Sequence, residues 1–271
     1  GNMKLGISTA SLDGKLNTED ALRWIGDQGA QCAEVFLATF CEYDRAFAKE
    51  LVRAKRATGI SISSMHTLNT QYEGQLFSRH ERQKRDAMNI FCSVLDIGAE
   101  LGAKNYVLHG PAQIRYVKHN TDYPHFAAVT QELSRACRER GMRLTWENVH
   151  WTHYNHPDFI SRLSEAAGEP LYTTLDIKQA MQSGTDAFTY LEAMGERLVN
   201  VHVCDFDAEG VLYLPLKGEF DIRALFDRTR ALPSVETAVI EVYDRSFSRL
   251  EELADSYKAL LELYESTGKD A

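Results

Sequence analysis

The chain of 271 residues accommodates one α/β barrel or two modest domains, and a hydrophobic share of 44% supplies a sizeable core. A net charge of −9 disfavours nucleic acid as a partner, because an acidic surface repels a phosphate backbone. Five widely spaced cysteines without a Cys-x-x-Cys pair exclude a disulfide framework and a zinc ribbon, which favours a reducing compartment.

Short apolar runs rich in β-branched residues alternate along the chain with longer amphipathic segments. In chain order, the predicted strands are residues 4–8, 33–37, 60–66, 105–109, 143–148, 171–176, 198–204 and 237–242. The predicted helices are residues 18–28, 44–58, 79–101, 124–140, 156–167, 186–194, 222–230 and 247–265. Eight strand–helix repeats over this length predict a parallel sheet closed into a (β/α)8 TIM barrel, with residues 1–271 as a single domain.

The rival architecture is an open, doubly wound sheet. Such a sheet normally carries a glycine-rich phosphate-binding turn after its first strand. Residues 8–14 read Ser-Thr-Ala-Ser-Leu-Asp-Gly and lack the G-x-G-x-x-G pattern. We therefore expect the closed barrel.

Polar residues at the carboxyl ends of barrel strands face the active site. Six consecutive predicted strands deliver a histidine or an acidic residue to that rim: His66, His109, Glu147, Asp176, His202 and Glu241. Converging carboxylates repel each other unless a cation or a proton binds between them. The pattern therefore predicts a metal site.

Glu147, Asp176, His202 and Glu241 come from four adjacent strands. Three carboxylates and one imidazole form a mainly oxygen site, which suits Mn, Mg or Co and permits Zn. We expect one divalent ion with open positions that a sugar hydroxyl and carbonyl could fill. The ion would act as a Lewis acid on the carbonyl and stabilise an enediolate.

The motifs at these strand ends carry a family resemblance. They are Trp-Glu-Asn at 146–148, Leu-Asp-Ile-Lys-Gln-Ala at 175–180, Val-His-Val-Cys-Asp at 201–205 and Ile-Glu-Val at 240–242. The chain resembles the xylose isomerase-like TIM barrels over essentially its whole length. Within them it is similar to the sugar phosphate isomerase/epimerase group, which includes ketose 3-epimerases, inosose dehydratases and endonuclease IV.

The resemblance implies that Glu147, Asp176, His202 and Glu241 are metal ligands, and that the two glutamates also form the catalytic acid/base pair. The implied activity is isomerisation or epimerisation of a sugar, sugar phosphate or cyclitol by proton transfer next to a carbonyl. An inosose-type dehydratase uses the same proton abstraction and is the alternative. The expected partner is a small carbohydrate substrate, and the resemblance is compatible with a homo-oligomer.

The sequence departs from the endonuclease IV branch. That branch places a histidine three residues after the strand-six aspartate, where this chain has Gln179, and its Asp-x-His pair is not evident at 205–209. An apurinic-site endonuclease with a three-zinc cluster is therefore disfavoured. His66 and His109 match zinc-binding histidines of that branch, and here we expect them to contact substrate or to be hydrogen-bonded wall residues. A barrel that merely binds a ligand is also disfavoured, because all four expected metal ligands are present.

Four further residues are predicted to contact substrate: Lys178, Asp205, Lys217 and Trp151. Lys178 is also compatible with a surface position at a helix start, and Asp205 with support of His202. Lys217 lies in the loop after strand seven, and Trp151 lies in a histidine-rich loop where rings could stack on a sugar.

We expect no membrane contact and a cytoplasmic location. No apolar run approaches the roughly 18 residues of a membrane span, and the sequence opens without a signal-peptide pattern.

Overall fold

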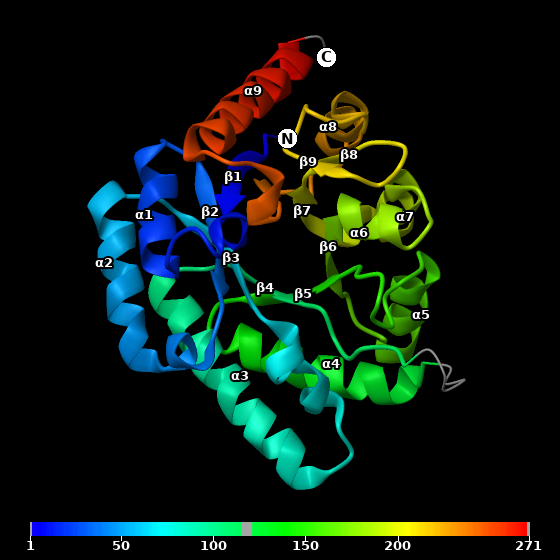
Figure 1. Cartoon of the computed structure of the whole chain (residues 1–271). Helices are drawn as coiled ribbons and strands as arrows, with labels where there is room; N and C mark the ends of the chain where they lie inside the picture. Colours follow the sequence, from blue (N-terminus) through cyan, green and yellow to red (C-terminus); the bar gives the residue numbers. More distant parts are fainter. Residues whose placement is uncertain (1, 115–120, 270–271) are drawn as a thin grey trace.

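The computed structural model describes residues 2–114 and 121–269. Eight parallel strands close into a barrel in the order β1, β10, β7, β6, β5, β4, β3 and β2, with helices around the outside (Figure 1). The predicted (β/α)8 barrel is confirmed. The barrel strands are β1 (Lys4–Ser8), β2 (Cys32–Leu37), β3 (Ile62–Thr67), β4 (Asn105–Leu108), β5 (Arg143–Glu147), β6 (Tyr172–Asp176), β7 (Leu198–Val203) and β10 (Thr237–Ile240).

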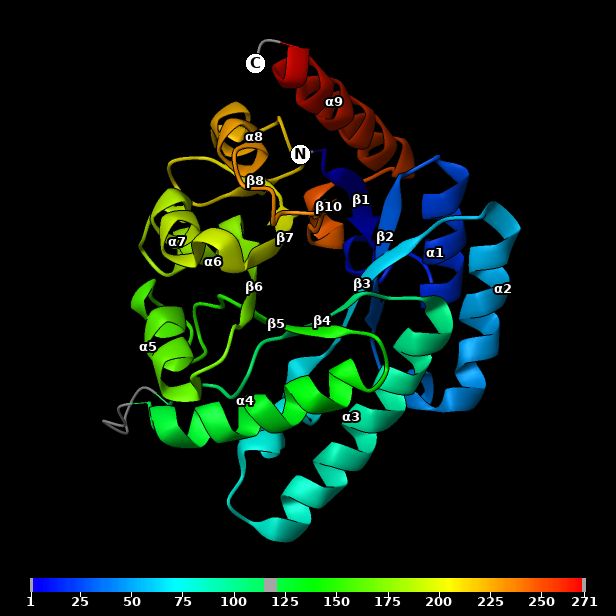
Figure 2. The ribbon, with the colours of Figure 1, turned by 180° about the vertical axis from the view of Figure 1, so that it is seen from behind.

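The surrounding helices follow the predicted segments closely and are seen from the opposite side in Figure 2. They are α1 (Thr18–Asp27), α2 (Ala48–Thr58), α3 (Glu81–Leu101), α4 (Tyr123–Arg138), α5 (Asp158–Ala167), α6 (Ile177–Gln182), α7 (Ala187–Met194), α8 (Ile222–Arg230) and α9 (Leu250–Lys269). Across the part of the chain that the structure describes, none of these helices has both the length and the apolarity needed to cross a membrane.

Apart from short 3-10 turns, one helix and one hairpin were not predicted. Helix α6 starts directly after β6, because the Asp176 side chain accepts a hydrogen bond from the Gln179 N–H and so caps the helix. A short antiparallel hairpin, β8 (Asp205–Phe206) with β9 (Leu212–Tyr213), follows β7. Both insertions extend the carboxyl end of the barrel.

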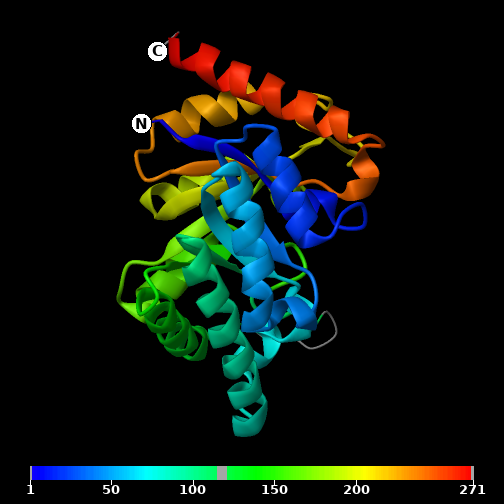
Figure 3. The same ribbon diagram turned by 90° about the vertical axis from the view of Figure 1, so that its left-hand side faces the viewer.

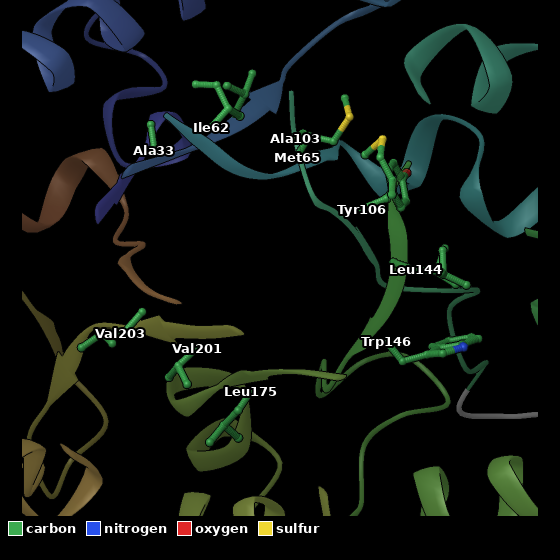
Figure 4. Close-up of a cluster of buried hydrophobic side chains, with 14 of the residues drawn as sticks. Ala33, Ile62, Met65, Ala103, Tyr106, Leu144, Trp146, Leu175, Val201 and Val203 are labelled. Carbon is green, nitrogen blue, oxygen red and sulfur yellow. The ribbon is translucent and has the colours of Figure 1, made fainter. Parts of the chain in front are cut away.

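Along each barrel strand, side chains point alternately outward, to the apolar layer beneath the helices, and inward, to the interior of the barrel. Met65, Leu175 and Val201 belong to the buried apolar cluster of the molecule (Figure 4). Since successive strand residues point to opposite faces, the neighbours Asp176 and His202 turn the other way, into the barrel. The polar side chains of the predicted rim are therefore carried on strands that are anchored by apolar packing on their outer faces.

Helix α9 fastens the first strand. The Tyr257 hydroxyl donates to the Leu5 carbonyl at 3.0 Å, and the Tyr264 hydroxyl accepts from the Met3 N–H at 2.8 Å. Figure 3 shows α9 lying along α8, above the start of the chain. The last helix thus covers the strand that closes the barrel against β10.

Candidate metal and active site

The four predicted metal ligands meet at the carboxyl ends of neighbouring strands. Glu147 and Asp176 are the last residues of β5 and β6, His202 lies in β7 beside Asp176, and Glu241 follows β10. One ligand atom from each side chain lies within 4.8 Å of the other three. Three of the side chains are almost fully buried, and only that of Glu241 keeps 16% of its surface exposed.

His202 directs one ring nitrogen at all three carboxylates. Its Nδ1 lies 2.7 Å from Glu147 Oε2, 3.2 Å from Glu241 Oε2 and 3.5 Å from Asp176 Oδ2. A divalent ion at this point would be surrounded by one nitrogen and several carboxylate oxygens, the donor set expected for Mn, Mg or Co.

The pKa values of the two glutamates are pushed in opposite directions. Burial opposes ionisation of Glu147, but the nearby His202 and His109 hold its pKa well below the ordinary value. Burial, together with the charges of Glu147 and Asp176, raises the pKa of Glu241 to about 8 against the attraction of His202. Glu241 Oε2 has no hydrogen-bond partner among the described residues. A buried carboxylate oxygen without a hydrogen bond, beside two further carboxylates, fits a bound cation.

Glu34 is a central residue that sequence reasoning missed. It lies in β2, is fully buried, and places Oε1 2.7 Å from His202 Nε2. Within the described residues, neither Glu34 Oε1 nor His202 Nε2 has hydrogen-bond geometry, so this contact is an ion pair between the carboxylate and the imidazolium. The other oxygen of Glu34 accepts from the Ser64 hydroxyl and from the Asn200 amide. Burial opposes the charge of Glu34, yet His202 lowers its pKa to about 2.

His66 and His109 line the same interior. His66 Nε2 lies 3.2 Å from Glu34 Oε1 and 3.6 Å from Glu241 Oε2, while His109 Nε2 lies 2.8 Å from Glu147 Oε1. Burial lowers the pKa of His66 to about 4. Burial also opposes the charge of His109, but Glu147 raises its pKa well above the ordinary value. His109 therefore pairs as a cation with Glu147.

Glu73 is a second buried carboxylate that the sequence did not reveal. It opens a short 3-10 turn after β3 and accepts hydrogen bonds from the backbone N–H groups of His109 and Gly110, at 2.9 and 3.3 Å. The Tyr106 hydroxyl donates to its other oxygen. Glu73 thus holds the end of β4, which carries His109.

Lys178 does not sit on the surface. It is 96% buried, and its Nζ lies 4.2 Å from the centre of the Tyr243 ring. Burial opposes its charge, but Asp176 and Glu241 raise its pKa above the ordinary value. Lys178 therefore brings a fixed positive charge next to the carboxylates.

Asp205 organises its own loop. Its Oδ1 accepts from the N–H groups of Phe206 and Phe220 at 2.8 and 3.0 Å, and its Oδ2 accepts from Leu216 N–H at 2.9 Å. A Cβ on Gly218 would come within 2.4 Å of Asp205 Oδ1, so this loop can close only over a glycine. Among the described residues, Asp205 forms no hydrogen bond with His202, and substrate contact by Asp205 stays a prediction.

Lys217 and Trp151 lie farther out. Both are exposed and are carried by the loops after β7 and β5, respectively. Trp151 presents 36% of its surface to solvent. Neither side chain joins the buried carboxylate cluster, so substrate contact by these two residues would occur at the mouth of the site.

Comparisons with known proteins agree with this geometry. A family model described as "Xylose isomerase-like TIM barrel" matches residues 22–266. A search of curated proteins finds no match.

Solved structures with a similar fold include three named as epimerases or epimerase-like. A D-tagatose 3-epimerase-like protein aligns with a TM-score of 0.82 at 14% identity, covering 99% of both chains. An L-ribulose 3-epimerase gives 0.78 at 15% identity, over 99% of this chain and 97% of the other. A 3-keto-D-glucoside 4-epimerase from E. coli gives 0.74 at 18% identity, over 96% of this chain and 100% of the other. At sequence identities this low, the structural similarity establishes that the fold is shared and no more than that.

Proposed function

Because the chain belongs to the xylose isomerase-like TIM barrel family, we propose that it is a divalent-metal-dependent isomerase or epimerase of a sugar, sugar phosphate or cyclitol. The observation that carries this proposal is the meeting of Glu147, Asp176, His202 and Glu241 within 4.8 Å at the mouth of the barrel. The names of the solved relatives support a carbohydrate substrate. Five free cysteines support the predicted reducing, cytoplasmic location.

The four clustered side chains would hold the metal ion. His202 would bind through Nδ1, the nitrogen that faces the three carboxylates. Oxygen-rich donors favour Mn, Mg or Co over Zn. When bound, a divalent ion supplies Lewis-acid polarisation of the substrate carbonyl.

The two glutamates move the proton. One removes a proton from the carbon next to the carbonyl, and the other delivers a proton to the opposite face of the same carbon, which inverts the stereocentre. Delivery to the former carbonyl carbon would instead move the carbonyl along the chain, which is isomerisation. The surroundings of the two carboxyl groups differ, because His202 and His109 favour ionisation of Glu147 and hold its pKa low, whereas burial and the neighbouring carboxylates oppose ionisation of Glu241 and raise its pKa.

Residues around the cluster would orient the substrate. Lys178 can bind a developing negative charge on oxygen, because its ammonium is fixed beside Asp176 and Glu241. His66 and His109 line the interior wall, and Trp151 and Lys217 could reach the substrate from the rim. Asp205 would act indirectly, by fixing the loop that carries Lys217.

Incubation in D2O with ketoses, ketose phosphates and inososes tests this function. We expect deuterium to enter at the carbon next to the carbonyl of at least one substrate. Glu147→Gln and Glu241→Gln should each lower turnover by about 100-fold or more, the usual effect of losing a positioned acid or base. Glu42→Gln is the matched control, because Glu42 is a buried carboxylate that binds Thr18 and Ala38 instead.

Elemental analysis of each variant separates loss of chemistry from loss of metal. Full activity in either glutamate variant with metal still bound would contradict the paired-glutamate mechanism. Deuterium uptake without inversion, accompanied by loss of water, would instead assign the dehydratase reaction.

A further inference from the structure

A polar pocket of about 620 Å³ lies beside the candidate site, between the loops after β4 and β5 and the end of α6. It is lined by Gln113, His150, Trp151, Asn155, Gln182 and Ser183. None of the residues that would hold the metal ion contributes to it. The pocket is therefore a separate space, and its volume lies in the range that binds small molecules.

The pocket adjoins the catalytic groups through the chain and through one side chain. His150 follows Glu147 by three residues, which places their Cα atoms at most about 11 Å apart. Gln179 bridges the two spaces, since its N–H donates to Asp176 Oδ1 at 2.9 Å while its Oε1 accepts from the His150 N–H at 3.0 Å. A ligand of two linked sugar rings is therefore long enough to reach from one space into the other.

The hydrogen-bonding character of His150 follows from that bridge. The atom of Gln179 that faces His150 must be its oxygen, because it receives a backbone N–H. His150 Nδ1 lies 2.6 Å from the same oxygen and so carries the ring proton. In the neutral ring, Nε2 is left as an acceptor for a ligand hydroxyl.

The walls of the pocket are fixed in advance. The Gln113 N–H donates to the Trp151 carbonyl at 3.0 Å, and the Gln113 side-chain oxygen accepts from Asn155 Nδ2 at 2.6 Å. The second contact leaves the amide nitrogen of Gln113 as a donor. On the opposite side, the Ser183 hydroxyl is 2.8 Å from the Tyr190 hydroxyl. A preformed pocket loses little entropy when it binds a ligand.

The lining selects a neutral, hydroxyl-rich ligand. None of these six described residues is acidic, a lysine or an arginine, so they offer no countercharge to a phosphate or carboxylate group. Amide, imidazole and hydroxyl groups match the alternating donors and acceptors of a sugar. The partly exposed indole of Trp151 offers a flat apolar surface for the C–H face of a pyranose ring.

We propose that this pocket is a subsite for a second sugar ring, so that the substrate is a glycosylated keto-sugar whose reacting ring lies over Glu147 and Glu241. This proposal rests on the isomerase or epimerase function given above. The glycosyl ring stays chemically unchanged, and its binding energy positions the reacting ring against the two glutamates.

Calorimetric titration of the metal-loaded full chain tests the subsite. The probes are the glycosyl-ketoses lactulose, maltulose and palatinose, compared with free D-fructose and D-tagatose. We expect at least one glycosyl-ketose to bind about 10-fold or more tightly than either free ketose. Trp151→Ala and Gln113→Leu should each reduce that ratio to about one. Phe40→Ala, a change at an exposed aromatic side chain in the loop after β2, is the matched control and should preserve the ratio.

Equal affinity for the glycosyl-ketoses and the free ketoses would overturn the subsite, as would an unchanged ratio in both pocket variants. Deuterium exchange on the same sugars keeps the two proposals distinguishable. Exchange into free ketoses without any preference for a glycosyl-ketose would leave the enzymatic function standing and remove the subsite. Tight binding of a glycosyl-ketose without deuterium exchange into any sugar would leave the sugar-binding subsite standing and remove the enzymatic function.

Discussion

The substitution Glu34→Gln isolates the contribution of the carboxylate behind His202. Glutamine keeps the size of the side chain and can still accept from Ser64 and Asn200 through its oxygen. Its amide NH2 would then face His202 Nε2, where Glu34 Oε1 lies at 2.7 Å. Because an NH2 group only donates, His202 would have to accept at Nε2 and carry its proton on Nδ1. That tautomer blocks the nitrogen expected to bind metal.

The expected magnitude follows from this change of tautomer. Loss of a carboxylate that orients a metal-binding histidine typically weakens metal binding by about 10- to 100-fold, or about 1.4–2.7 kcal/mol. With the amide reversed, the oxygen of the introduced glutamine would face His202, but its NH2 group would then face the donors of Ser64 and Asn200. Metal binding would have to overcome this unfavourable contact. Either arrangement therefore lowers metal affinity.

Competitive titration of Mn2+ against a fluorescent chelator measures this loss without relying on activity. Glu42→Gln is the matched control, because it neutralises another buried carboxylate that has no contact with His202. We expect Glu34→Gln to weaken Mn2+ binding and Glu42→Gln to leave it unchanged while lowering thermal stability. Wild-type Mn2+ affinity in Glu34→Gln would refute the reasoning, provided that melting shows the variant to be folded.

Three further predictions concern the metal, the pH and nucleic acid. His202→Ala should abolish the EDTA-sensitive part of the melting temperature and leave a cooperative transition, because a bound ion stabilises only the native state; an EDTA-sensitive transition in the variant would argue against His202 as a ligand. The metal-free protein should lose stability as the pH rises from about 4.5 to about 8, because the raised pKa of Glu241 makes the folded state bind a proton that the unfolded chain releases. Glu241→Gln should reduce this dependence of stability on pH, and melting curves at pH 5.5 and 8.5 measure it. With a net charge of −9, the chain should not bind or incise duplex DNA carrying an abasic site at physiological salt, and incision that Glu147→Gln abolishes would overturn the sugar assignment.

The sequence predicted the barrel and the meeting of the four ligand candidates because both follow from local rules. Strand period and length locate the strands, and the rule that parallel strands align their carboxyl ends brings Glu147, Asp176 and His202 together. Helix α6 escaped prediction because six residues are too few to display a helical period. Its cap, Asp176, was already interpreted as a ligand.

Glu34 and Glu73 were missed for a different reason. Glu34 is a single acidic residue in the middle of the apolar run 32–37, away from the strand end where function was sought. Its isolation between Ala33 and Val35 was the one available signal, since a buried charge needs a partner. Glu73 sits in a loop, and its partners His109 and Gly110 are more than 30 residues away. Contacts of that range depend on the tertiary fold, which no local pattern encodes.

The contacts that two tyrosines of α9 make with the first strand can form only late in synthesis of the chain. Tyr264 and Tyr257 hold Met3 and Leu5 across 261 and 252 residues of chain, and α9 leaves the ribosome after every strand of the barrel. The first strand made is thus among the last to be covered. Contacts of such long sequence separation slow folding and prolong the exposure of unpaired strand edges. Until α9 packs against it, β1 lacks the two hydrogen bonds from Tyr257 and Tyr264, and a chaperone can shield this part of the growing chain.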